Sequence, residues 1–285
     1  MKTVLLTSVA LLAFAGNSVL CRLALGDELI DAAGFTSLRL LSGSLMLVVL
    51  VLIKTKGAPN FSLFKNSFRQ FFVASMLFLY ALCFSLAYLQ LDTGSGALIL
   101  FGFVQITLLF SSWYFEKSPK LQEVLGMILA FSGLIYWLIP AWGTPTLFGF
   151  LLMAIAGVAW GLYTFFGRMA KQPLFETSMN FIYCLPLVAL LNLLVFQPQF
   201  WSLKGVVYAF ISGTITSGIG YAVWYAVLPK LTSMNAAVLQ LLVPVVAAFG
   251  GWLVVSETIS SRWIVSAVMV LGGVFWVIQS NLESK

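Results

Sequence analysis

The chain has 285 residues, of which 61% are hydrophobic and 8% are charged, and its mean hydropathy is +1.03. Soluble domains carry about 25% charged residues, so this composition excludes an ordinary soluble protein. The net charge of +6 gives no sign of nucleic-acid binding, because the basic residues lie in short loops between apolar runs. Several uncharged runs are long enough to cross ~30 Å of hydrocarbon as helices, which predicts an all-α polytopic membrane protein.

Ten apolar segments predict about ten transmembrane helices, with connections mostly too short for a separate soluble domain. The first segment has one feature of a secretory signal peptide, since Ala13, Phe14 and Ala15 precede Gly16. The apolar pattern continues to Leu25, which favours a membrane helix over a cleaved signal. The predicted helices cover residues 3–23, 33–53, 68–89, 95–115, 121–139, 147–169, 177–196, 206–228, 234–255 and 263–279.

The basic residues are divided unequally between the two sides of the membrane. With a cytoplasmic N-terminus, eleven Lys and Arg residues fall on the cytoplasmic side, and only Arg22, Lys204 and Arg262 on the other. Loops rich in Lys and Arg remain in the cytoplasm. We therefore expect both termini there, with the chain in a plasma membrane of the bacterial inner-membrane type.

The two halves of the sequence resemble each other. Residues 125–137 (LGMILAFSGLIYW) are similar to residues 265–277 (VSAVMVLGGVFWV), and residues 15–24 are similar to residues 159–170, each with an arginine near the end. A unit of five helices has an odd number of crossings, so two such units must lie in opposite orientations. Inverted repeats are typical of alternating-access carriers. The predicted units are residues 1–140 and 146–285.

No catalytic or metal-binding set is recognisable. The sequence has no histidine, no phosphate-binding GxxxxGKS and no serine nucleophile elbow, and no pair of carboxylates lies at mid-membrane depth. Cys21, Cys83 and Cys184 fall in or beside apolar runs, which is typical of small hydrophobic residues and not of a disulfide framework or metal site. The sequence disfavours an enzyme, and we expect no cofactor and no metal.

Arg39 is the strongest polar signal inside a span. It lies roughly 10 Å inside the second predicted helix. Burial at that depth costs about 2.5 kcal/mol or more unless the guanidinium reaches the interface, pairs or meets water. Two interpretations are open: an anchor for a substrate carboxylate or other anion, or a structural arginine that reaches the external interface or bonds helix-end carbonyls.

The ninth segment carries Pro244 near its middle. A proline has no N–H, so the carbonyl of Gln240, one turn earlier, loses its helical partner, and lipid cannot replace it. Gln105 lies at the corresponding depth of the fourth segment. The break predicts either a packing kink or part of the wall of a polar cavity. In the eighth segment, the run SGTITSGIG at 212–220 weakens its helix.

Other spans contain further candidates for a substrate-binding wall. Aromatic residues make up 15% of the chain, so most are expected to face lipid or to pack. Tyr221, Trp224 and Tyr225 share one helical face by their spacing, which favours that cluster. The remaining candidates are Asn17, Tyr80, Tyr88, Trp160, Tyr163 and Asn180.

Glu116 and Glu257 close corresponding apolar runs on opposite membrane faces. Carboxylates at helix ends are usually solvated or bonded to backbone dipoles. A gating pair is the alternative, because closing one face would bring a helix end inward. Arg262 lies close to Glu257 in sequence, which predicts a simple ion pair within the loop.

Several short motifs occur in a familiar order: Leu-Pro-Lys at 228–230, Pro244-Val-Val, Gly251-Trp, Ser-Glu257 and Gly-Gly at 272–273. Together with residues 35–45 and 126–135, they resemble the EamA-type drug/metabolite transporter superfamily over nearly the whole chain. Val243 departs from the family pattern, which usually has a glutamate directly before this proline.

The resemblance implies a secondary transporter in the lipid bilayer, with two inverted five-helix repeats around a central cavity. The leading expectation is alternating-access export of amino acids or similar small metabolites, as in the YddG-like branch. Arg39 or helix ends would hold the carboxylate, and the aromatic and amide wall would take the side chain. One alternative is an exchanger of phosphorylated or nucleobase-type metabolites. A carrier of phosphorylated metabolites would have further basic side chains in the cavity besides Arg39. A non-transporting scaffold or lipid-binding protein is another. The sequence sets no oligomeric state.

Overall fold

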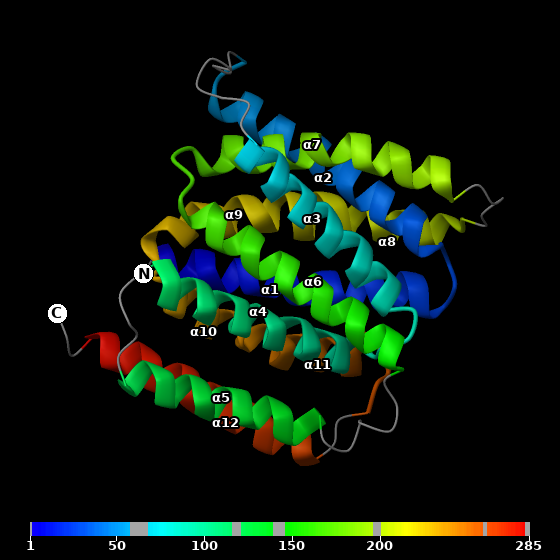
Figure 1. Ribbon diagram of the computed structural model, residues 1–285. Coiled ribbons are helices and arrows are strands. Elements are labelled where there is room, and N and C mark those ends of the chain that lie inside the picture. Colours follow the sequence, from blue (N-terminus) through cyan, green and yellow to red (C-terminus); the bar gives the residue numbers. More distant parts are fainter. Residues whose placement is uncertain are drawn as a thin grey trace.

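The computed structural model describes residues 2–57, 68–115, 121–138, 146–195, 201–258 and 261–282, and the regular structure in these ranges is helical (Figure 1). Ten helical rods occupy the places of the ten predicted segments, which confirms the all-α polytopic fold. The rods of the first half are α1 (Lys2–Gly26), α2 (Ala32–Lys54), α3 (Phe68–Ala87), α4 (Thr93–Phe115) and α5 (Leu121–Leu138).

The second half repeats this number of rods, but two of its rods are interrupted. The eighth contains a π-helical stretch, and the ninth breaks at Leu241. Its elements are α6 (Leu147–Arg168), α7 (Pro173–Leu194), the rod of α8 (Leu203–Ile211), η3 (Ser212–Ile219), α9 (Gly220–Val227) and η4 (Leu228–Lys230), the rod of α10 (Ser233–Gln240) and α11 (Leu242–Val255), and α12 (Ser261–Leu282).

The rods have the length and composition of membrane-spanning helices. Among the described residues, eight are long and apolar enough to cross a membrane. The apolar stretches of α5 and α12 are shorter, covering Val124–Gly133 and Ser261–Val277.

Polar side chains fix the starts of several rods. Asp31, Thr146, Ser202 and Thr232 each accept a hydrogen bond from the backbone N–H three residues further on, at 2.7 to 3.1 Å. These N-caps satisfy one of the N–H groups that a helix start leaves without a partner. The sequence therefore sets where α2, α6, α8 and α10 begin.

The two halves of the chain are interleaved in one bundle. α1 packs against α8, η3, α9 and α11 of the second half, whereas α6 packs against α3 and α4 of the first. α2 lies against α7, and α4 lies against α10 and α11. Figure 1 shows α1 running away from the end that carries the N-terminus and α6 running back toward it. Residues from both halves therefore meet in the middle of the bundle.

α5 and α12 form a separate pair along one edge of the bundle (Figure 1). Glycines allow their backbones to approach closely, since a Cβ atom on Gly273 would lie 2.4 Å from the carbonyl oxygen of Gly126. Close contact at small residues is a usual way for helices to associate in lipid. This pair contributes no predicted binding residue, so the candidate site belongs to the other eight rods.

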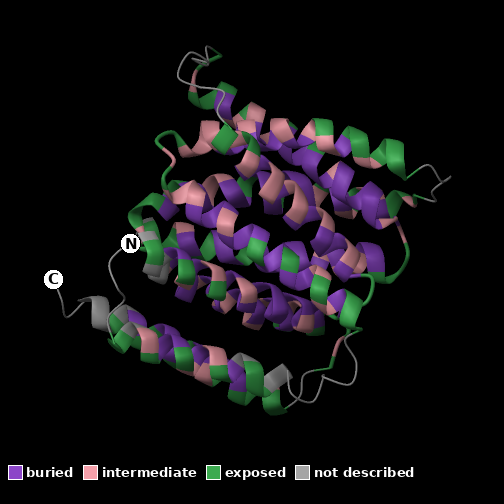
Figure 2. Cartoon of the chain, in the orientation of Figure 1, coloured by how far each residue is buried: buried purple, intermediate pink, exposed green. Residues whose placement is uncertain are grey.

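The burial pattern matches a bundle surrounded by lipid. Figure 2 shows buried residues gathered along the inner faces of the helices and exposed residues on the outer faces. Many of the exposed side chains are large and apolar, such as Leu5, Phe110 and Leu253. A soluble monomer rarely shows so much exposed apolar surface, whereas lipid covers it without cost.

Candidate functional site

Arg39 of α2 lies at the centre of the bundle, with 1% of its surface exposed. Its Nε donates a hydrogen bond to Ser217 Oγ at 2.9 Å, and its Nη2 donates to the hydroxyls of Tyr80 and Tyr221 at 3.0 Å each. The rings of Tyr80 and Phe84 lie 5.1 and 5.3 Å from the guanidinium carbon. The structural interpretation of Arg39 was therefore wrong in its details, because the side chain neither reaches the interface nor bonds helix-end carbonyls.

The positive charge of Arg39 has no counter-ion among the described residues. No described carboxylate oxygen lies within 4.0 Å of it, and its Nη1 makes no hydrogen bond there. Neutral hydroxyls and ring faces compensate only part of the cost of burying a guanidinium. The Nη1 group of this buried cation is therefore left without a hydrogen-bond partner among the described residues.

The π-helical stretch η3 supplies the polar groups around this cation. Ser217 bonds Arg39, while Ser212 and Thr216 donate to Asn17 Oδ1 at 2.7 and 3.3 Å. A Cβ atom on Gly213 would lie 2.4 Å from the carbonyl oxygen of Arg39, so only glycine allows η3 to lie this close to α2. π-helical segments often mark functional sites. The weakened helix predicted at 212–220 is thus the element that builds the site.

Asn17 of α1 connects η3 to α3, because its Nδ2 lies 3.5 Å from the Tyr80 hydroxyl. Tyr80 therefore shares its hydroxyl between Asn17 and Arg39. Four elements, α1, α2, α3 and the eighth rod, meet in this network. The structure brings together four of the candidate residues, Asn17, Arg39, Tyr80 and Tyr221.

An aromatic cluster adjoins the arginine. Trp160 lies 4.9 Å from the rings of both Tyr80 and Tyr221, measured between centroids, and 5.6 Å from Tyr163. Tyr163 lies 5.2 Å from Tyr225 in turn. Sequence reasoning missed Phe14, which lies edge-on to Trp160, Tyr221 and Trp224. Its position three residues before Asn17, on the same face of α1, was the available signal.

The break near Pro244 is held by two glutamines. The rod is interrupted at Leu241, whose N–H turns to Val238 at 3.1 Å and so no longer serves the carbonyl of Ala237. Gln105 Nε2 donates to that carbonyl at 2.6 Å, and the Trp160 indole N–H donates to Gln240 Oε1 at 2.8 Å. The Gln105 amide thus replaces a main-chain bond that lipid could not replace, while Gln240 Nε2 donates to the carbonyl of Ala236 at 3.0 Å.

The predicted open cavity is not present around Arg39 in this conformation. Arg39, Tyr221 and Gln240 are all 1% exposed or less, because aromatic side chains from both halves fill the space between them. Of the predicted residues, Asn180 and Tyr225 also line a pocket, at the end of the bundle that carries the N-terminus. The centre is closed and polar, not open and solvated.

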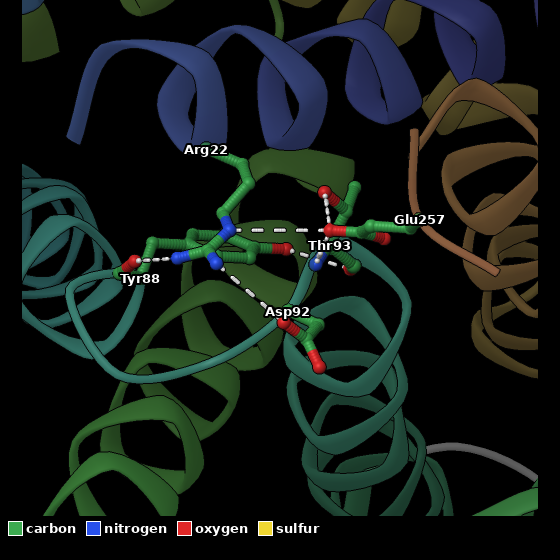
Figure 3. Close-up of polar contacts among 5 residues, drawn as sticks. All are labelled: Arg22, Tyr88, Asp92, Thr93 and Glu257. Atoms are coloured by element: carbon green, nitrogen blue, oxygen red, sulfur yellow. Dashed lines mark hydrogen bonds and ion pairs between the residues drawn. The ribbon is translucent and has the colours of Figure 1, made fainter. Parts of the chain in front are cut away.

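Glu257 belongs to a different cluster (Figure 3), at the end of the bundle away from the N-terminus, where α11 ends and α4 begins (Figure 1). Its Oε1 accepts hydrogen bonds from Thr93 N and Oγ1 at 2.9 and 2.8 Å, which caps the start of α4. Arg22 Nε lies 3.9 Å from the same oxygen. The predicted loop ion pair with Arg262 is therefore wrong, since Arg262 lies over the ring of Tyr136 instead.

Arg22 joins three elements in this cluster. Its Nη2 lies 3.5 Å from Asp92 Oδ1, and its Nη1 donates to the carbonyl of Tyr88 at 3.3 Å (Figure 3). The end of α1, the turn between α3 and α4, and the end of α11 are thereby tied together. We call Arg22, Asp92, Thr93 and Glu257 the clasp. Glu116 lies outside the described residues.

Comparison with known proteins is consistent with this architecture. The EamA-like transporter family matches residues 147–279. An uncharacterized protein of Pseudomonas aeruginosa is 46% identical over 99% of this chain and 96% of its own length. The uncharacterized transporter YoaV of Bacillus subtilis is 22% identical over 85% of each chain, and an uncharacterized transporter of Archaeoglobus fulgidus is 25% identical over 96% of each.

A protein of known crystal structure shares the fold, with a TM-score of 0.77, 18% identity and coverage of 98% of both chains. Apolar helices of spanning length make the chain a multi-pass membrane protein. The family points to a transporter and not to an enzyme. The chain belongs to the EamA-like transporters of the drug/metabolite transporter superfamily.

Proposed function

We propose that this transporter exports small carboxylate-bearing metabolites, chiefly amino acids, by alternating access. One observation carries the proposal: Arg39 is buried at the centre of the bundle without a carboxylate partner, and its Nη1 is unbonded among the described residues. A guanidinium binds a carboxylate through two parallel N–H groups, and in a site shielded from water such a bond is strong. A substrate carboxylate would supply the missing negative charge.

The surrounding side chains suit the rest of such a substrate. The hydroxyls of Tyr80 and Tyr221 and the amide of Asn17 offer polar contacts beside the carboxylate. Trp160 and Tyr163 offer apolar ring surface further along. The substrate-binding roles of Gln105, Asn180, Trp224, Tyr225, Gln240 and Pro244 remain part of this proposal.

Alternating access requires two inverted halves, and three features support them in residues 1–140 and 146–285. The helix pairing is exchanged, with α1 against the second half and α6 against the first. In Figure 1 each first-half helix runs opposite to its counterpart. Arg22 lies near the end of α1 and Arg168 is the last residue of α6. Each donates to a carbonyl just before the fourth rod of a half, that of Tyr88 and that of Leu231.

The clasp is the proposed gate at the end distant from the N-terminus. It joins α1, α4 and α11, so separating these elements requires that Glu257 leave Thr93 and Arg22. Basic residues are concentrated at the opposite end, which supports cytoplasmic termini. The clasp would then close the external face of a bacterial inner-membrane carrier.

Phosphorylated metabolites fit the centre less well. Among the described residues, Arg39 is the one buried Lys or Arg. A phosphate carries up to two negative charges, and several basic groups usually share it. A single guanidinium matches the single charge of a carboxylate.

Counterflow in proteoliposomes tests the proposal. The panel contains amino acids, nucleobases and phosphorylated sugars, and we expect uptake of carboxylate-bearing substrates. Arg39→Gln should lower that uptake at least about tenfold, because a charge-assisted pair in a dry site is lost. Arg262→Gln is the matched control, since that guanidinium contacts a ring at the bundle edge. Unchanged uptake by folded Arg39→Gln protein would refute the anchor role.

A further inference from the structure

A pocket opens at the end of the bundle that carries the N-terminus, opposite the clasp. Its cavity volume is about 60 Å³, and it opens to solvent between the start of α3, the end of α6, the start of α7 and the end of α9. We call it the vestibule. The polar residues that line it are Arg69, Gln70, Glu176, Thr177, Asn180 and Tyr225.

Two opposite charges line the vestibule without pairing. Arg69 comes from α3 and Glu176 from α7, and no ion pair within 4.0 Å joins them. Arg69 Nη2 donates to the carbonyl of Phe166 at 3.1 Å, and its guanidinium lies over that residue's ring. Glu176 Oε1 accepts from the backbone N–H groups of Lys171 and Gln172 at 2.8 and 3.1 Å. Each charge is thus held in place by the backbone, away from the other.

The inner wall of the vestibule carries polar atoms that lack partners. Tyr225 is 2% exposed, and its hydroxyl makes no hydrogen bond to the described residues. The hydroxyl of neighbouring Tyr163 is also unbonded. A Cβ atom on Gly167 would lie 1.9 Å from the Tyr225 ring, so the glycine makes room for that ring at the wall. Buried hydroxyls without partners cost free energy unless a ligand bonds them.

A row of rings leads from this wall to the central arginine. Tyr225 contacts Tyr163, whose ring centroid lies 6.5 Å from that of Tyr221. The hydroxyl of Tyr221 accepts the hydrogen bond from Arg39. A row of three tyrosine side chains, Tyr225, Tyr163 and Tyr221, thus connects the wall of the vestibule with Arg39.

We propose that the vestibule is a first binding site for zwitterionic α-amino acids. The substrate carboxylate binds Arg69 and accepts a hydrogen bond from the Tyr225 hydroxyl, and its ammonium group binds Glu176 and the side-chain oxygen of Asn180. An acid without an amino group meets the repulsion of Glu176, and an amine without a carboxylate meets that of Arg69, so the two charges select the zwitterion. The inference rests on the proposed transport of amino acids but not on the anchor role of Arg39.

Binding to the purified protein in nanodiscs tests the inference. The probes are labelled leucine, methionine and glutamine, together with isocaproate and isoamylamine, which lack the amino and carboxylate groups of leucine. In an Arg39→Gln background, we expect amino-acid binding to persist at the vestibule. Glu176→Gln and Arg69→Gln should each weaken it about tenfold. Glu176→Gln should also admit isocaproate, and Arg69→Gln should admit isoamylamine.

Lys54→Gln is the matched control, because Lys54 is a charged residue at the same end that lines a different pocket. Loss of all amino-acid binding in Arg39→Gln would overturn the vestibule site and leave the anchor at Arg39 standing. Amino-acid binding unaffected by Glu176→Gln and Arg69→Gln would overturn it too, as would wild-type protein that binds none of the three amino acids. If Glu176→Gln and Arg69→Gln weaken amino-acid binding while Arg39→Gln leaves counterflow unchanged, the anchor role of Arg39 is refuted and the vestibule site stands.

Discussion

At one end of the bundle Arg22 Nε lies 3.9 Å from Glu257 Oε1. Glu257 accepts a hydrogen bond from Thr93 at the start of α4, and Arg22 donates one to the carbonyl of Tyr88 in the turn before it. At the other end Arg69 and Glu176 line one pocket without an ion pair between them. Both ends place an arginine and a glutamate between helices of different halves. In the clasp the opposite charges lie against each other, whereas in the vestibule each charge bonds the backbone separately and also lines a space that a solute can occupy. The difference suits a carrier that is closed on one side and accessible on the other.

Two corresponding arginines sharpen this comparison, Arg22 near the end of α1 and Arg168 at the end of α6. Arg22 donates to the carbonyl of Tyr88, and Arg168 donates to that of Leu231 at 2.9 Å. The same kind of bond thus occurs at both ends, between corresponding elements. What the clasp adds is Glu257, which the chain turns back toward α4: Ser256 adopts a left-handed conformation with φ of 61°, and Glu257 N–H then bonds the carbonyl of Gly251 at 3.2 Å.

Removing the clasp carboxylate should have the largest effect. Glu257→Ala leaves the N–H and hydroxyl of Thr93 without their acceptor, so we expect the free energy of unfolding to fall by about 3 kcal/mol. Cys21, which is buried beside Arg22, should become reactive toward an impermeant maleimide, while Cys184 stays protected. Unfolding in mixed micelles and mass spectrometry of the labelled peptides measure the two effects.

Asp27→Ala is the control for this prediction, because Asp27 is an exposed acid at the same end. An unchanged labelling rate of Cys21 in Glu257→Ala would show that the clasp does not hold this end closed.

The sequence was a good guide to the helices but a poor one to the clasp. Uncharged runs of spanning length identify membrane helices directly, because the bilayer permits few alternatives. The partner of Glu257 depends on how α4 and α11 lie against each other, and proximity in sequence favoured Arg262 instead. Thr93 and Arg22 are 164 and 235 positions away from Glu257, and no local pattern joins them.

The central site shows the same limit. Arg39, Asn17 and Gln240 could be predicted because a polar side chain inside a span needs a partner. The identity of the partner could not, because Ser217 reaches Arg39 through the π-helical register of η3. The aromatic wall was predicted in part, but the closure of the expected cavity results from packing between halves, which a single sequence does not encode locally.

A change at the vestibule should have a smaller effect, and at the other end. Gly167→Ala places a methyl group 1.9 Å from the Tyr225 ring, so the ring must move. We expect a loss of about 2 kcal/mol in the free energy of unfolding, as for other overpacked sites. Cys184 lies one turn from Asn180 on α7, so its labelling should rise while that of Cys21 does not.

Gly272→Ala is the matched control, because a Cβ atom there meets nothing within 4 Å. Equal destabilisation by both substitutions would mean that the cost comes from the glycine backbone and not from contact with Tyr225.

The smallest expected effect separates the two bonds that Glu257 accepts. Thr93→Val keeps the shape of the side chain and the backbone N–H but removes the hydroxyl, whose bond to Glu257 is 2.8 Å long. One hydrogen bond of this kind contributes about 1 kcal/mol, so labelling of Cys21 should rise only about fivefold. In the Glu257→Ala background the same substitution should have almost no effect, because its acceptor is already gone. If Thr93→Val costs as much in that background as alone, the hydroxyl stabilises α4 independently of the clasp.

The two substitutions together show which group holds this end closed. Thr93→Val keeps the bond from Thr93 N–H to Glu257, whereas Glu257→Ala removes both bonds. A small rise in Cys21 labelling for Thr93→Val and a large rise for Glu257→Ala would assign the closure to the carboxylate and not to the start of α4.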